Sequence, residues 1–197
     1  MAWTLQAAFL CLLLKPSLVK ADFQTAVGNI DHASHAIRLL FSERKKFYVA
    51  GGTFEEDPLL IKNSGLPFKC GEVQTRKNSQ EIFSLERNIY YERLPKKWLK
   101  TYYDMKTGKS PEYQSPNFMN ASRHQGDRTI YSGTIYLLLS DWNTCALFYH
   151  KTTDDCELWE KKRPGRDGMP SSFCSRYITA CNAKTVNYYF NYIECHT

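Results

Sequence analysis

Hydrophobic and polar residues follow two different periods along this chain. In the first part, apolar residues recur every three or four positions, at Ile30, Ala33, Ile37, Leu40 and Phe41. This spacing places them on one face of a helix, and Asp31 can cap its first turn. We therefore predict an amphipathic helix over residues 30–43.

After Lys46 the period changes to the two-residue alternation of strands that are buried on one face. Seven segments have this character: KFYVAGGTF, PFKCGEVQT, EIFSLER, WLKTYYDM, TIYSGTIYLLLS, CALFYH and CELWE. The two glycines of the first segment indicate a strand that is strongly bent or closely packed. Polar, turn-forming pieces such as KTGKSPEYQSPN, SRHQGDR and KTTDD separate the segments. Short strands without intervening helices predict an all-β domain of seven or eight strands, either a meander barrel or a sandwich.

The C-terminal part interrupts the strand pattern. In SSFCSRYITAC, one helical stripe carries Phe173, Cys174, Tyr177 and Cys181, and a serine is available to cap the helix. The segment TVNYYFNYIEC then returns to strand or extended chain. We predict one short helix followed by an extended C-terminus.

The first residues have the pattern of a secretory signal peptide. Leu5 to Leu14 form an apolar run too short to span a bilayer, and Val19 and Ala21 are small residues suited to precede a cleavage site. We predict a signal peptide over residues 1–21 and a single secreted domain over residues 22–197. No later stretch has 18 consecutive apolar residues, so the sequence predicts no membrane anchor.

The cysteines and the charge restrict the kinds of partner. Six cysteines follow the predicted signal peptide, and an even number in a secreted chain predicts three disulfides, with fifteen pairings open. Their spacing does not suit a metal site. The formal charge of +6 is spread along the chain, which predicts a solvated surface rather than a nucleic-acid interface. Asn120, in Asn120-Ala121-Ser122, is a candidate glycosylation site.

The CELW segment presents two different faces. In a strand, Cys156 and Leu158 point to one side, while Glu157 and Trp159 point to the other. A cysteine and a leucine are typical of a face packed against protein. A buried carboxylate on the other face needs a cation, hydrogen bonds or a proton. Glu157 would therefore contact a cationic ligand, pair with an internal lysine or arginine, or lie solvated at a barrel mouth.

Several short motifs follow one another in a distinctive order. The predicted helix precedes a strand that ends in FEEDP, at Phe54 to Pro58. SDWNTCALF, CELW, a cysteine-bearing helix and a C-terminal cysteine follow. This order and the cysteine spacing resemble those of the tick salivary lipocalins of the histamine-binding family. The resemblance covers essentially all of residues 22–197 and is strongest over residues 140–195.

The resemblance implies an eight-stranded antiparallel up-and-down barrel, with an N-terminal helix at one end and a C-terminal helix packed on the outside. It also implies two disulfides and leaves a third pair over, so that the bridges are Cys70–Cys195, Cys145–Cys174 and Cys156–Cys181. With the second helix against the outer wall, Glu157 and Trp159 face the barrel interior.

The resemblance also implies a set of ligand-binding residues. Glu157 matches an acidic position that meets the ammonium group of the ligand, and Trp159 could add a cation–π contact. Asp57 matches a second acidic position. Phe54 stands where some members have a tyrosine.

Further positions modify this set. Tyr136 stands where the sixth strand can carry an inward acid, and Asp104 or Glu92 is a candidate for a further pocket acid. Ala146 replaces an aspartate found in members with a second amine site. These replacements favour a single amine site over two. With fewer acids the pocket is more apolar, which favours serotonin, or lipids such as leukotrienes and sterols, as the ligand.

We therefore expect a secreted, monomeric protein that sequesters a small host mediator, histamine or serotonin first, and so suppresses host defence. The alternatives are a scavenger of a lipid mediator and a lipocalin that binds a host defence protein through its loops, such as KTGKSPEYQSPNF and EKKRPGRDGMP. An enzyme is not expected, because no serine lies in a G-x-S-x-G context and the cysteines are expected to be oxidised. His150, at the end of a predicted strand, is interpreted as a surface histidine. No cofactor, metal, nucleic-acid or membrane partner is expected.

Overall fold

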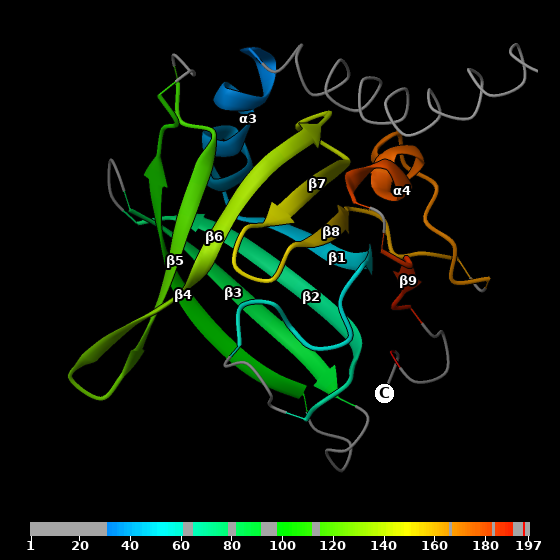
Figure 1. The fold of residues 1–197 in the computed structure, drawn as a ribbon, viewed down its shortest axis with the longest axis horizontal. Coiled ribbons are helices and arrows are strands. Elements are labelled where there is room, and N and C mark those ends of the chain that lie inside the picture. The colour runs from blue at the N-terminus through cyan, green and yellow to red at the C-terminus, as the bar shows by residue number, and fades with distance from the viewer. Residues whose placement is uncertain are drawn as a thin grey trace, which may run out of the picture.

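The fold is known from a computed structural model (Figure 1). It describes residues 31–60, 65–78, 82–91, 98–111, 115–165, 167–182, 184–190 and 195, with side chains from residue 37 onward. The predicted signal peptide lies outside the described residues. Within them, no helix is long and apolar enough to cross a membrane.

Eight antiparallel strands close into a barrel, as the resemblance implied. The strands are β1 (Lys45–Gly52), β2 (Phe68–Lys77), β3 (Ile82–Tyr91), β4 (Trp98–Gly108), β5 (Phe118–Gln125), β6 (Arg128–Ser140), β7 (Cys145–His150) and β8 (Asp155–Glu160), with a short β9 (Asn187–Tyr188) beside β1. The strands from β2 to β8 pair in sequence order, and β1 pairs with both β8 and β2, which closes the ring. The prediction of a barrel is confirmed, and the alternative of a sandwich is excluded.

Alternation along the strands decides which side chains fill the barrel. In β3, every second residue is buried, and these are Phe83, Leu85, Arg87, Ile89 and Tyr91. Four of the five are apolar or aromatic and belong to the main hydrophobic core. The fifth is an arginine with no exposed surface. Such a position requires charged partners inside the barrel.

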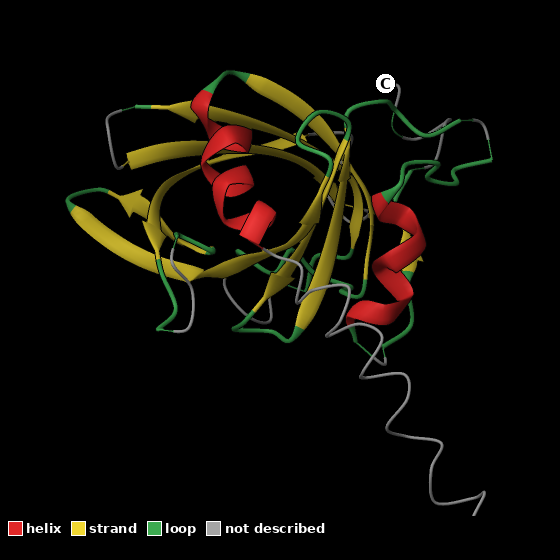
Figure 2. Ribbon diagram, turned by 90° about the horizontal axis from the view of Figure 1, so that it is seen from above, coloured by secondary structure: helices red, strands yellow, loops and turns green. Residues whose placement is uncertain are grey.

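The helix α3 (Asp31–Ser42) covers one end of the barrel, where it lies across the opening (Figure 2). Its buried face is made of Ile37, Leu40 and Phe41, as the periodicity predicted. The Phe41 ring lies 6.1 Å from the ring of Phe83 and 6.2 Å from that of Trp159. The Thr75 hydroxyl donates to the Leu40 carbonyl over 2.7 Å, which ties the helix to β2.

A second helical segment packs on the outer wall (Figure 1). It consists of the 3-10 helix η1 (Cys174–Tyr177) and the helix α4 (Ile178–Cys181). Cys174 and Ile178 are buried and form an outer cluster with Leu158. The helix predicted here is present but shorter, and Phe173, placed on the buried stripe by the sequence, is 47% exposed.

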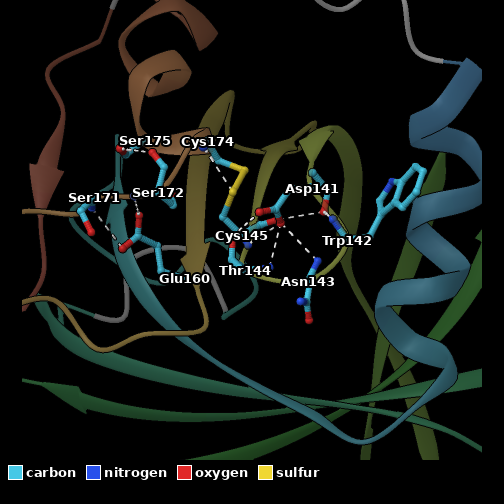
Figure 3. The surroundings of a disulfide bond; sticks show 11 residues. Asp141, Trp142, Asn143, Thr144, Cys145, Glu160, Ser171, Ser172, Cys174 and Ser175 are labelled. Atoms are coloured by element: carbon cyan, nitrogen blue, oxygen red, sulfur yellow. Dashed lines mark hydrogen bonds between the residues drawn. A yellow bond between two sulfur atoms is a disulfide. The ribbon is translucent and has the colours of Figure 1, made fainter.

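Three disulfides join the barrel to the C-terminal part, with the pairing that the resemblance implied: Cys70–Cys195, Cys145–Cys174 and Cys156–Cys181. Figure 3 shows Cys145–Cys174, which fastens η1 to the start of β7. The carboxylate of Asp141 caps the neighbouring turn by accepting the backbone N–H groups of Asn143, Thr144 and Cys145.

Strand β5 was not predicted from the sequence. Its inward residues are Met119 and Ala121, which are buried, while the polar residues beside them, Asn120 and Ser122, are half-buried. β5 pairs with β4 only over Phe118–Ser122, and beyond this point β5 and β6 continue as a projecting hairpin (Figure 1). The two strands β4 and β5 therefore diverge near the end of the barrel that α3 does not cover.

Candidate ligand site inside the barrel

The segment that follows β1 turns into the barrel at the end opposite α3. Phe54, Asp57 and Leu59 are 3%, 4% and 1% exposed. The Tyr103 hydroxyl donates to the Leu59 carbonyl over 3.2 Å. The hydroxyl of Tyr189 accepts the Phe54 N–H over 3.2 Å and donates to the Phe54 carbonyl. This inward turn brings Phe54, Asp57 and Leu59 into the core, and we call residues 54–60 the FEEDP loop.

Arg87 lies between the two carboxylates that the sequence singled out. Its Nε is 3.0 Å from Oδ2 of Asp57, and its Nη1 is 2.7 Å from Oε1 of Glu157. All three side chains are at most 1% exposed. Burial alone lowers the pKa of Arg87, but the charges of Asp57 and Glu157 outweigh it and raise the pKa. The guanidinium is therefore charged at every accessible pH.

Glu157 accepts hydrogen bonds from three side chains. Besides Arg87, Nε1 of Trp159 donates to Oε1 over 2.8 Å, and Nε2 of His150 lies 2.6 Å from Oε2. Burial raises the pKa of this carboxyl, but Arg87 and the hydrogen bonds from His150 and Trp159 outweigh it and lower the pKa to about 2. Glu157 is thus an ionised carboxylate with an internal partner.

The structure contradicts the interpretation of His150 as a surface histidine. Its side chain is 3% exposed, because it lies against Glu157 and Phe54 in the interior. The ring of Phe54 lies 6.4 Å from its imidazole. In the neutral form, a proton on Nε2 serves the bond to Glu157 and leaves Nδ1 as an acceptor.

Three polar atoms around this cluster have no hydrogen-bond partner among the described residues. They are Nη2 of Arg87, the hydroxyl of Tyr91 and Nδ1 of His150. Burial raises the pKa of the Tyr91 hydroxyl above its ordinary value. The group therefore stays protonated and can donate or accept a hydrogen bond. Buried polar groups are normally paired, so orphaned atoms in one region indicate a place where a ligand or water supplies the missing bonds.

The other half of the interior, toward α3, is aromatic. The Trp159 ring lies 4.3 Å from Phe148, 5.9 Å from Phe47 and 6.2 Å from Phe41. Trp159 therefore has one polar contact, to Glu157, and otherwise packs against rings. The barrel interior thus divides into a polar half near the FEEDP loop and an apolar half near α3.

The structure brings together four of the six predicted ligand-binding residues, namely Glu157, Asp57, Phe54 and Trp159. Tyr136 and Asp104 are elsewhere. Tyr136 lies between the inward residues Ile135 and Leu137, so it faces outward, where it packs on Phe118 and Tyr149.

Asp104 is likewise on the outer face. Its neighbours Tyr103 and Met105 point inward, and its own side chain is 46% exposed and bound to His124. These placements correct the expectation that Tyr136 and Asp104 line the barrel pocket, and the alternative acid, Glu92, lies outside the described residues. Asn120 is half-buried on β5 and accepts a hydrogen bond from Thr134 over 2.7 Å; its glycosylation stays a prediction.

Sequence reasoning missed Arg87, although a signal for it was present. In EIFSLERNIYY, alternation places Arg87 on the same face as Phe83, Leu85 and Ile89. A charged residue in that series is an anomaly that alternation makes visible. The alternative in which Glu157 pairs with an internal arginine is the one that the structure shows.

Comparisons with known proteins identify the family. The family model described as tick histamine binding protein matches residues 27–197. Comparison with curated protein sequences finds no significant match.

Among solved structures, the chain is similar to the serotonin complex of AM182, with a TM-score of 0.51 and 12% identity over 80% of this chain and 90% of that chain. It is also similar to a complex of LTBP1 with LTC4, with a TM-score of 0.47 and 12% identity over 78% and 84% of the two chains. Japanin from Rhipicephalus appendiculatus bound to cholesterol gives a TM-score of 0.41 and 16% identity over 77% and 95%. At 12% identity, the similarity to the AM182 complex shows the fold alone. The barrel, its three disulfides and the family match over residues 27–197 together show that the chain belongs to the tick histamine-binding protein family of lipocalins.

Proposed function

We propose that this protein is a secreted, salivary binding protein that sequesters one small biogenic amine, histamine or serotonin. The amine would bind beside Glu157, in the polar half of the barrel interior. The supporting observation is the charge of the buried cluster. Two carboxylates, Asp57 and Glu157, share a single guanidinium, Arg87. Two carboxylates beside one guanidinium call for a second cation, and the ammonium group of an amine can supply it.

The orphaned atoms fit the rest of such a ligand. Nδ1 of His150 and the hydroxyl of Tyr91 can accept hydrogen bonds from an ammonium group, while Nη2 of Arg87 can donate to an acceptor on the ligand. Histamine has a ring nitrogen as acceptor, and serotonin has a hydroxyl. Each amine therefore has a cation for the two protein acceptors and an acceptor for Nη2 of Arg87.

Access is governed by the FEEDP loop. Asp57 and Leu59 are buried and fill the end of the barrel that α3 leaves uncovered. An amine that enters here displaces Leu59. Its ammonium group then replaces Arg87 in part of the interaction with Asp57. The protein acts by mass action and needs no catalytic step, so its effect depends on its concentration and affinity.

The test is isothermal titration of the refolded protein with histamine and with serotonin. We expect one site per chain, and Glu157→Gln should weaken binding by a factor of ten or more, about 1.4 kcal/mol. Glu160→Gln is the matched control, because Glu160 is also buried on β8 but accepts the backbone N–H groups of Ser171 and Ser172 outside the barrel.

Absence of heat with both amines contradicts the amine proposal. In that case the alternative of a lipid mediator is tested by mass spectrometry of lipids extracted from the purified protein. A complex with a plasma protein that survives size-exclusion chromatography would instead support the host-protein alternative.

A further inference from the structure

A hollow lies at the uncovered end of the barrel, outside the Arg87 cluster. It has a volume of about 280 Å³ and is bounded by the FEEDP loop, the β5–β6 hairpin and the turn between β7 and β8. We call it the end hollow. Its apolar wall is made of Pro58, Leu59, Leu60 and Ile130. No described residue that lines it is acidic.

Arg123 provides the one cationic side chain among the described residues that line this hollow. It continues the inward series of Met119 and Ala121 on β5, just beyond the point where β5 separates from β4. No described carboxylate lies within ion-pair distance of its guanidinium, whereas Lys100 and His124 are held by Glu86 and Asp104. Arg123 is therefore an uncompensated charge beside an apolar wall.

Two enclosed hydroxyl groups add hydrogen-bonding capacity to the end hollow. Ser132 Oγ and Thr153 Oγ1 are inaccessible to solvent and have no hydrogen-bond partner among the described residues, and both residues line the hollow. They come from different elements, β6 and the turn before β8. Arg123 also lines an adjoining hollow of about 550 Å³ between the diverging strands β4 and β5, so space extends past the guanidinium.

We propose that the end hollow is a second ligand site, which takes a monoanionic amphiphile of the long-chain carboxylate class. A carboxylate matches the single charge and the fork of Arg123, and the hydroxyls of Ser132 and Thr153 supply further donors. The hydrocarbon chain packs on Leu59, Leu60 and Ile130. A doubly charged phosphate would leave one negative charge uncompensated beside an apolar wall.

This site is independent of the amine proposal, because none of its charged or polar groups belongs to the Arg87 cluster. Leu59 is the one residue that both regions share, since its side chain borders the end hollow while its carbonyl accepts from Tyr103. Occupation of one site can therefore influence the other only through the FEEDP loop.

The experiment is isothermal titration of the full protein with decanoate, and with decanol and decyltrimethylammonium as uncharged and cationic counterparts. We expect decanoate to bind with one site, decanol to bind at least tenfold more weakly, and the cation not to bind. Each methylene removed from the chain should weaken binding about fourfold.

Arg123→Gln should weaken decanoate binding at least tenfold, while Arg128→Gln, a matched change at the exposed start of β6, should leave it within twofold. Thermal unfolding of both variants verifies the fold. Equal decanoate binding by wild type and Arg123→Gln, or no binding at millimolar concentration, overturns the proposal. Glu157→Gln frees Arg87 of one carboxylate, so decanoate binding that strengthens in this variant would place the anion inside the barrel and also overturn the proposal. The decanoate titrations can be interpreted whether or not the protein binds an amine.

Discussion

Arg87 and Glu157, which are 70 residues apart in sequence, are joined by a 2.7 Å ion pair inside the barrel. The pair links β3 to β8 across the interior, and Asp57, in the segment after β1, is joined to Nε of the same guanidinium. An ion pair without solvent contact has lost the hydration of both charges, so each partner depends on the other. The candidate ligand site is therefore also a structural centre of the barrel.

Replacement of Arg87 by methionine should destabilise the protein strongly. The change keeps much of the side-chain volume but leaves Asp57 and Glu157 as buried carboxylates without a cation. We expect the free energy of unfolding to fall by about 3–5 kcal/mol, as measured by urea denaturation at neutral pH. Arg76→Met is the control, because Arg76 is exposed at the end of β2. Similar losses in the two variants would show that the internal pair does not stabilise the fold.

The lowered pKa of Glu157 should make stability depend on pH. Burial raises this pKa, but Arg87, His150 and Trp159 hold it at about 2, against 4.5 for a free glutamate. The unfolded chain therefore takes up the proton first as the pH falls. The contribution of the ionised group is complete above about pH 4.5 and is lost progressively toward pH 2.

Urea denaturation between pH 7 and pH 2 measures this contribution, which we expect to be roughly 3 kcal/mol. Glu157→Gln should lack this part of the pH dependence, whereas Glu43→Gln, an exposed glutamate after α3, should keep it. If wild type and Glu157→Gln lose stability in parallel, the folded protein does not hold Glu157 in its ionised form as described.

Two buried tyrosines should respond differently to loss of their hydroxyl groups. Tyr189 bonds to both the N–H and the carbonyl of Phe54, so Tyr189→Phe should cost about 1 kcal/mol of unfolding free energy. The Tyr91 hydroxyl has no partner among the described residues, so Tyr91→Phe should change stability by less than about 0.5 kcal/mol.

Amine titration of the same pair separates structural from ligand roles. If Tyr91 contacts the ligand as proposed, Tyr91→Phe should weaken amine binding severalfold while leaving the unfolding curve unchanged. Tyr189→Phe should show the reverse. Unchanged amine affinity in Tyr91→Phe would remove Tyr91 from the proposed site.

Local sequence pattern was sufficient for most of the barrel but not for β5. The strands β1, β2, β3, β4, β6, β7 and β8 carry clear alternation of apolar residues, and the resemblance supplied the closure and the three disulfides. In β5 the inward residues Met119 and Ala121 are followed only by polar residues, from Ser122 to Gln125, so the alternation is short and weak. Its pairing with β4 and β6 is what makes it a strand.

The site was predictable residue by residue only where alternation fixes the direction of a side chain. Glu157 and Trp159 point inward as expected, and the same rule applied to β6 and β4 would have placed Tyr136 and Asp104 outside. The partnership of Arg87 with Asp57 and Glu157 spans 30 and 70 residues. It depends on barrel register and on the inward turn of the FEEDP loop, and no local pattern specifies these.

Gly52, the last residue of β1, should tolerate no side chain. A Cβ atom there would lie 2.7 Å from the carbonyl oxygen of Cys156 and 2.4 Å from Cε1 of Phe54. The sequence predicted a bent or closely packed strand at this point, and close packing is what the structure shows. The Cys156 carbonyl also accepts the N–H of Thr53 over 3.1 Å, so moving it away from a new Cβ atom would break this hydrogen bond.

Gly52→Ala should therefore lower the free energy of unfolding by about 1–3 kcal/mol, because the ring of Phe54 and the β1–β8 contact must both shift. Gly165→Ala, in an exposed loop, is the control and should change stability by less than about 0.5 kcal/mol. Since Phe54 begins the FEEDP motif, amine binding should weaken in Gly52→Ala as Asp57 is displaced from Arg87. A stable Gly52→Ala protein with unchanged amine affinity would show that the position of this loop is not set by close packing at Gly52.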